Sequence, residues 1–413
     1  MTKKSLPASA THGGIVFIGL IAFLLSLFSV KYFGLFNSVA DQALYVSLCT
    51  AALIFLFEFV FFKTYRRAST GLNFETSNPS LLRTFVKFLG LLGSLGFIAF
   101  LYWLFPEYHG DFYNQYYVML SRILPFFLLL AIPYIYFVDR YQVEPLDSYY
   151  QVGQICLFNF GKVNWRSLKN HFLGWLIKGF FLPLMFTYLS QDINHFNRVD
   201  FSKMNDFKSY FDFLYDLIFA IDVGIVSMGY MMSFRLTDTH LRSAEPTSLG
   251  WLVALFCYQP FWSLFSRQYI DYDNHKGWAT WFANSPLMYE VWGCVILFLF
   301  SIYVWSSLNF GCRFSNLTHR GILTNGPYRW TKHPAYLSKC TAWWLISLPF
   351  LVSESWSESL RRSLLLLILN GVYFLRARTE ERHLSQDPVY SQYAEWIQEN
   401  GIFSKLKIAL LFR

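Results

Sequence analysis

The side chains best suited to chemistry lie in two short polar segments joined by one apolar hairpin. The first segment, "TNGPYRWTKHPAYLSK" (324–339), combines two prolines, a glycine, cationic residues and His333. The second, "RARTEERHL" (376–384), begins with Arg376 and contains a pair of glutamates. A guanidinium can orient a carboxylate through paired hydrogen bonds, and a glutamate or histidine can take a proton from an amine. These residue types indicate a site that binds or activates a polar group at a membrane boundary.

The elements between the two segments bring them together. The apolar stretches 335–353 and 359–375 are joined by a short turn at "SESWSES", so they form a hairpin that returns its ends to one face. The Asn-Gly-Pro sequence at 325–327 predicts a tight turn. His333-Pro334 predicts a helix start, because proline in the first helical position has no N–H to lose. That helix start directs free N–H groups at the loop, a favourable place for a carboxylate.

The tail after 375 is expected to continue the last membrane helix out of the bilayer. Arg376 and Glu380 are four residues apart and share one helix face. Farther along, Tyr390, Tyr393 and Trp396 recur at helical spacing. This amphipathic pattern predicts a helix that folds back over the loop.

The composition predicts an all-α polytopic membrane protein. The chain is 54% hydrophobic and 21% aromatic, with only 15% charged residues. Ten apolar blocks have about the length that a helix needs to cross the hydrocarbon core. These are 15–36, 43–62, 84–105, 119–138, 172–191, 210–234, 249–265, 287–308, 335–353 and 359–375. Because only helices and closed barrels satisfy their backbones in lipid, we expect about ten transmembrane helices. The first block is too long for a cleavable signal and lacks a small-residue cleavage site.

The distribution of charge predicts the orientation. With the N-terminus inside, inner segments hold 22 of the 34 Lys and Arg residues and outer loops hold 8. This bias predicts that both termini are cytoplasmic. The net charge of +8 then reflects topology and attraction to anionic lipid, and we expect no nucleic-acid partner. Six scattered cysteines without a CxxC pair argue against a disulfide framework or a zinc site, and no metal is expected.

Four polar segments fall on the same predicted inner face, namely 139–171, 235–248, 309–334 and 376–413. Their agreement points to a site on the cytoplasmic side. The host membrane would be a bacterial inner membrane, or the endoplasmic reticulum membrane in a eukaryote.

The two motifs resemble a known family. "GPYRWTKHPAYLSK", followed one hairpin later by "RARTEERHL" and "YSQYAEW", is similar to the C-terminal core of the isoprenylcysteine carboxyl methyltransferase and phospholipid methyltransferase superfamily. Those are integral-membrane enzymes that use S-adenosylmethionine. The resemblance implies a methyltransferase-like core in 287–413, preceded by a transmembrane region, 1–286, of about seven helices and unknown role.

Carried over by position, the resemblance implies a cofactor site. Ile322 and Leu323 would flank the adenosine, and Tyr328 would contact the cofactor. The residues implied around the methionine part are His333, Pro334, Ala335 and Tyr336. This chain departs from the prenylcysteine enzymes at Arg320-Gly321, where they often carry His-Thr, and at Lys332, which replaces the commoner Arg.

The tail would supply the catalytic pair. Glu380 would hydrogen-bond the cofactor with Glu381 beside it, and Arg376 would face the methyl acceptor. A carboxylate acceptor is already nucleophilic and needs only an orienting cation, which Arg376 supplies. An amine acceptor would need to lose a proton, for which Glu380, Glu381 or His383 are candidates. The acceptor would be a lipid or isoprenoid that arrives from the bilayer, with carboxyl O-methylation favoured.

Acidic residues inside apolar blocks need a separate explanation. Glu58, Asp216, Asp222 and Glu290 fall where charge is costly and usually functional or paired. Asp222 is the deepest of them. It either pairs with a cation such as Lys178 or lines a substrate cavity.

Other functions remain open at this point. A phospholipid amine N-methyltransferase fits the same motifs. An NADPH-dependent sterol-type reductase has a similar C-terminal membrane core. A non-enzymatic lipid transporter would account for many spans and buried acids, but it predicts internal repeats, and none is evident in the sequence.

Overall fold

The computed structural model describes residues 5–266, 268–273, 276–352 and 354–404, whose regular secondary structure is almost all helix. The helices of the first part are α1 (Gly13–Phe33), α2 (Val39–Val60), α3 (Leu81–Leu104), α4 (Asn114–Tyr141), α5 (Ser148–Cys156), α6 (Trp165–Arg198) and α7 (Phe207–Met231). Those of the second part are α8 (Ser248–Leu255), α9 (Phe261–Ser266), α10 (Trp278–Trp281), α11 (Pro286–Leu308), α12 (Pro334–Ser347), α13 (Trp356–Leu384) and α14 (Pro388–Asn400). The strands β1 (Ser243–Ala244) and β2 (Thr318–His319) form one short antiparallel ribbon.

Six helices in the described ranges are long and apolar enough to cross a membrane. They are α1, α2, α3, α4 with the turn before it, α6 and α11. Helices α7 and α13, with 25 and 29 residues, are also long enough at 1.5 Å per residue, although both carry charged side chains. Helix α12 has only 14 residues. The architecture is that of an all-α polytopic membrane protein.

The prediction of one continuous helix over 249–265 is wrong. The chain there forms α8 of 8 residues and α9 of 6 residues, separated by a turn at 256–260. Pro260 explains the break, because proline lacks an N–H and disfavours helical geometry in the residue before it. The broken segment packs along α13, where Phe256, Cys257 and Trp262 contact a cluster built on Leu366 and Leu369.

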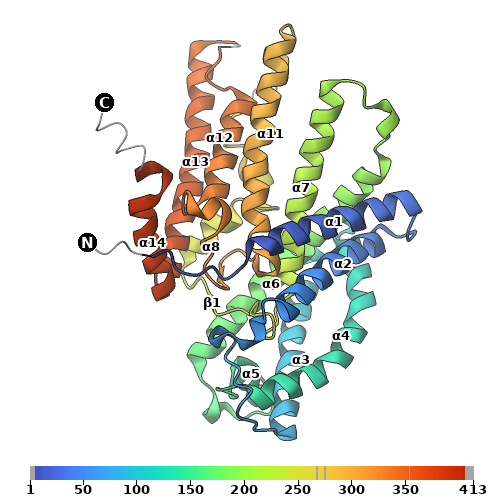
Figure 1. The fold of residues 1–413 in the computed structure, drawn as a ribbon, viewed down its shortest axis with the longest axis vertical. Helices are drawn as coiled ribbons and strands as arrows, with labels where there is room; N and C mark the ends of the chain where they lie inside the picture. The colour runs from blue at the N-terminus through green and yellow to red at the C-terminus, as the bar shows by residue number, and fades with distance from the viewer. Residues whose placement is uncertain (1–4, 267, 274–275, 353, 405–413) are drawn as a thin grey trace.

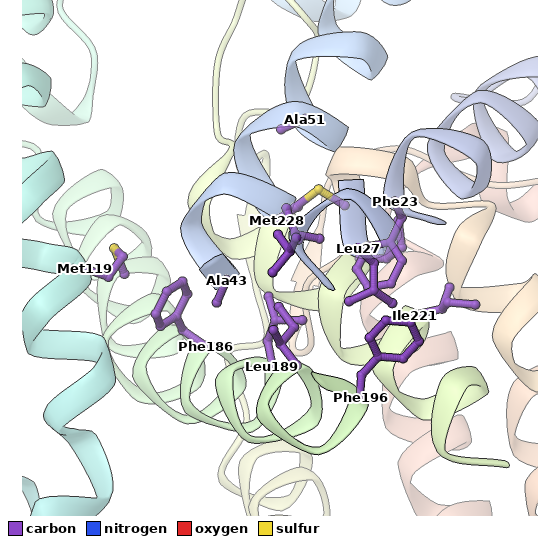
Figure 2. Packing of buried hydrophobic residues seen from close by; sticks show 14 of the residues in the cluster. Phe23, Leu27, Ala43, Ala51, Met119, Phe186, Leu189, Phe196, Ile221 and Met228 are labelled. Carbon is purple, nitrogen blue, oxygen red and sulfur yellow. The ribbon is translucent and has the colours of Figure 1, made fainter. Parts of the chain in front are cut away.

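Helices α7, α11, α12 and α13 run roughly parallel in the upper half of Figure 1, α3, α4 and α5 lie in the lower half, and α1 and α2 cross between them. The largest apolar cluster lies where these groups meet. Phe23 and Leu27 of α1 pack there against Phe186 and Leu189 of α6 and Met228 of α7 (Figure 2). In lipid, such contacts stabilise mainly through close van der Waals packing. Helix α1 is therefore packed closely against α6 and α7.

The polar segments expected on one face do lie together. Leu72 forms an antiparallel bridge with Gln142, and the Ser69 hydroxyl donates to Asp238 at 2.8 Å. The β1–β2 ribbon joins the 235–248 segment to the 309–334 segment. Loops far apart in sequence thus form one polar layer across the molecule.

Two of the acids in the apolar blocks have ion-pair partners. Glu58, on α2, forms an ion pair with Arg313, and both side chains are almost fully buried. Arg313 also donates to the Thr237 carbonyl at 2.7 Å, so this pair joins α2 to the polar layer. Asp216 lies 3.0 Å from His195. Glu290, in the first turns of α11, is exposed.

Candidate active site

The loop 324–339 and the tail meet as predicted. The His333 Nε2 atom lies 3.0 Å from Glu381 Oε1, and His333 Nδ1 lies 3.8 Å from Glu380 Oε2. The contact arises because α12 and α13 form a hairpin whose open ends return to the polar layer (Figure 1).

The local structure of the loop follows from its turn residues. Gly326 has a φ of 55°, in the left-handed region that favours glycine. An added Cβ there would lie 2.6 Å from Asn309 Nδ2, so the turn is also closely packed. Helix α12 begins at Pro334 with His333 as its N-cap residue. The prediction of a helix start at His333-Pro334 is confirmed.

Arg376 is held rigidly at the centre of the site. It is only 5% exposed, and its guanidinium lies 5.2 Å from the Tyr336 ring centroid and 5.6 Å from that of Tyr258. Its Nη2 donates to Asn316 Oδ1 at 2.5 Å, and its Nε lies 3.4 Å from Glu380 Oε1. Contacts on several sides of the guanidinium fix its orientation in the site.

The two glutamates have different partners. The Tyr336 hydroxyl donates to Glu380. Glu381 instead accepts from Lys332 Nζ at 2.8 Å and from His333. Burial alone would raise the pKa of Glu381, but the hydrogen bonds and charges of His333 and Lys332 outweigh burial and lower it to about 2. Glu381 therefore stays ionised and holds His333 in place.

A cavity of about 330 Å³ lies between α7, α11, α12, α13 and the polar layer. Its volume falls in the range of small-molecule sites. Seven of the predicted site residues line it, namely Tyr328, His333, Pro334, Ala335, Tyr336, Arg376 and Glu380.

Three predicted site residues are not among those that line this cavity. Ile322 and Leu323 are buried in an apolar cluster with Tyr328 and the two tyrosines of α14. Glu381 does not line the cavity but is hydrogen-bonded to His333. The amphipathic helix predicted from Tyr390 and its neighbours is present as α14 and packs over the loop.

The N-terminal segment fastens the same loop. The Ala10 N–H donates to the Ile322 carbonyl at 2.8 Å, and the Thr324 N–H donates to the Ser9 hydroxyl at 3.2 Å. The Thr11 hydroxyl donates to the Asn309 carbonyl at 2.7 Å. We call residues 9–11 the N-terminal strap. It connects the predicted adenosine-flanking residues to the other end of the chain.

Several site residues were not found from the sequence. Asn316, which holds Arg376, is itself bound to the hydroxyls of Tyr230 and Tyr258 at 2.9 and 3.0 Å. No spacing rule links these residues, since they come from the 309–334 loop, α7 and the break after α8. The break at Pro260 was the one available signal, because irregular backbone inside a membrane protein usually borders a cavity.

The proposed pairing of Asp222 with Lys178 is wrong. Asp222 Oδ2 accepts from the Tyr303 hydroxyl at 2.6 Å, and Asp222 lines the cavity. Lys178 lies over the Trp175 ring instead. Lys178 lies on α6 and Asp222 on α7, and hydrophobic periodicity does not determine which faces of these two helices meet.

Arg320, where the chain departs from the prenylcysteine enzymes, is a structural residue. It is buried and donates to the carbonyls of Thr239 and Gly229 at 2.6 Å each, and also to the carbonyl of Met232. Gly229 and Met232 are at the C-terminal end of α7, where carbonyls lack helical partners and favour a cation. Arg320 thus joins α7 to the loop beneath the site.

His319, in the β1–β2 ribbon next to the site, is expected to make the folded protein less stable in acid. Burial and the nearby Arg242 lower the pKa of His319 to about 4, although Asp387 opposes this. His319 therefore takes up a proton more readily in the unfolded chain than in the folded one. Its effect on the free energy of unfolding is absent above about pH 6.5, and that free energy falls as the pH drops toward 4. His319→Gln should reduce the loss of thermal stability between pH 7 and pH 5. His109→Gln, at an exposed histidine, is the control, and equal slopes for parent and His319→Gln would contradict this assignment.

Within the described residues, no group of three or more His, Cys, Asp or Glu side chains could hold a metal ion. The site instead offers a carboxylate, a buried guanidinium, aromatic rings and a helix N-terminus. Such a set can bind and orient a polar cofactor beside an acceptor.

Comparison with known proteins agrees with the sequence motifs. Residues 287–386 match the model of the isoprenylcysteine carboxyl methyltransferase (ICMT) family. The matched segment comprises nearly all of α11, all of α12 and α13, and the loops between them, which is less than half of the chain. It supports a membrane methyltransferase of this type. No curated protein and no solved structure matches the chain.

Proposed function

We propose that the protein is an integral-membrane, S-adenosylmethionine-dependent methyltransferase that methylates the carboxylate of a lipidic acceptor. The observation that carries the proposal is the convergence of the two motifs on one cavity, with Arg376 buried at its wall beside Glu380. The cavity lies where the polar layer meets the helix bundle. A polar cofactor and a membrane-borne acceptor can therefore both reach it.

The residues present fit this cofactor. The Tyr390 hydroxyl is buried, lines the cavity and has no hydrogen-bond partner among the described residues. Glu380 offers carboxylate oxygens to the same space. An unused hydroxyl and a carboxylate complement the hydroxyl and amino groups of a nucleoside joined to an amino acid.

The chain's own residues account for the rest of the reaction. The cofactor supplies an electrophilic methyl group on a sulfonium. Arg376 would orient the acceptor carboxylate, which needs no deprotonation. Glu381 and Lys332 hold His333 at the cavity wall, and Tyr336 fixes Glu380. Positioning and exclusion of water are the main requirements of such a displacement.

The test is cofactor binding and label transfer by the full chain in detergent. Tritiated S-adenosylmethionine should bind, and label should enter organic-soluble material when a membrane lipid extract is added. Glu380→Gln should weaken cofactor binding by roughly 10-fold or more, as expected for loss of a charged hydrogen-bond partner. Glu399→Gln, at an exposed position of α14, should not. Tight NADPH binding without S-adenosylmethionine binding would instead favour the reductase.

A further inference from the structure

The cavity extends beyond the predicted cofactor residues into α6 and α7. Met185 of α6 and Phe219, Val223 and Val226 of α7 give it an apolar wall. None of these lies in the segment that matches the methyltransferase family. The region before residue 287 therefore builds part of the chamber itself.

One polar side chain interrupts this apolar wall. Asp222 is 6% exposed, and its Oδ2 accepts from Tyr303 at 2.6 Å. Its Oδ1 makes no hydrogen bond of ordinary geometry among the residues described, although Ser307, which lines the same cavity, interacts with this carboxylate. Leaving a buried carboxylate oxygen unpaired is costly, and an acid within a membrane helix usually serves a function. The free oxygen is therefore available to a ligand in the cavity.

Two of the cations that line the same cavity lie on the C-terminal helices. Arg376 comes from α13, and Lys339 from α12. The Lys339 ammonium lies 5.0 Å from the Tyr303 ring centroid and 5.4 Å from that of Trp343. Lys339 also interacts electrostatically with Asp222. A ligand that binds between these side chains carries an anionic group for Arg376 and Lys339 and a hydrogen-bond donor for Asp222.

We propose that Asp222 selects the acceptor by accepting a hydrogen bond from it. This rests on the proposed function and narrows its substrate class to an apolar-tailed carboxylate with an N–H or O–H group close to the carboxylate. An acceptor without that donor leaves the Asp222 oxygen unpaired in a dry cavity. Sites built to hydrogen-bond a substrate group discriminate strongly against analogues that lack it.

The experiment compares two probes that differ in one group. N-palmitoylglycine has an amide N–H next to its carboxymethyl group, and O-palmitoylglycolate has an ester oxygen at the same position. Binding to the full chain in nanodiscs is measured by thermophoresis, with and without S-adenosylmethionine. The parent should bind the amide at least about 10-fold more tightly than the ester. If the parent binds the two probes with equal affinity, or binds neither probe, the proposal is overturned by this measurement alone.

Variants then assign the preference to Asp222. Asp222→Ala should weaken binding of the amide only and bring the two affinities within about twofold, with cofactor affinity unchanged. Asp216→Asn, at a half-exposed acid on the same helix, should retain the full preference. If Asp222→Ala weakens both probes equally, the proposal fails. Loss of cofactor binding by the parent would be a failure of the proposed function instead, so the two failures are distinguishable.

Discussion

Arg376→Ala is expected to lower kcat/KM for methyl transfer by about 100-fold or more. Arg376 is buried between two aromatic rings and bound to Asn316 and Glu380. Truncating one member of a buried, hydrogen-bonded charge pair costs about 2–5 kcal/mol, and each 1.4 kcal/mol is a factor of ten. The measurement is transfer of tritium from the cofactor to an acceptor.

The matched control is Arg378→Ala, two residues away on the same helix. The Arg378 side chain is 66% exposed and makes only a 3.6 Å ion pair with Glu381, so activity should change by no more than about threefold. Arg376→Lys keeps the charge but loses the planar guanidinium with its paired N–H donors, so its methyl-transfer activity should remain strongly impaired. Cofactor affinity and thermal stability are measured in parallel. If Arg376→Ala methylates as fast as Arg378→Ala, the assignment of Arg376 to the acceptor is wrong.

Arg313→Ala is expected to destabilise the protein by about 3–5 kcal/mol, because it leaves Glu58 charged and unpaired in the interior. The pair is almost inaccessible on both sides, and Arg313 also holds the Thr237 carbonyl. The measurement is reversible unfolding in mixed micelles with increasing dodecyl sulfate.

Two further variants separate this effect from simple loss of packing. Replacing both partners by apolar residues, Glu58→Leu with Arg313→Met, should recover most of the loss, because no charge is then left buried. Glu358→Ala removes a partner of both Arg361, which is half exposed, and Arg362, which keeps Glu354, and it should cost about 1 kcal/mol or less. A double variant no more stable than Arg313→Ala would show that the charge is not the cause.

The sequence predicted the elements that depend on local patterns. The hairpin, the turn at Gly326, the helix start at Pro334 and the amphipathic helix α14 all follow from residue type and spacing. The meeting of His333 with Glu380 and Glu381 followed because a hairpin leaves little freedom to its ends. The family match over 287–386 confirms the resemblance of that segment.

What the sequence did not predict depends on contacts between distant elements. Asn316 and Tyr258 fix Arg376 through pairings that no periodicity encodes. Asp222 was recognised as unusual, but its partner was assigned wrongly because hydropathy does not specify how helices rotate against one another. The apolar block at 249–265 was predicted as one membrane span, whereas the chain there forms two short helices separated at Pro260.

The N-terminal strap has a consequence for synthesis. The Ser9 hydroxyl is hydrogen-bonded to Asn325, a residue 316 positions later. At about 5–20 residues per second, the ribosome needs roughly 15 to 60 seconds to reach that partner. Residues 9–11 therefore cannot complete these contacts until Asn325, 316 residues after Ser9, has been synthesised. The loop that they fasten takes its final form only late in translation, so a chain that stops early carries no finished site.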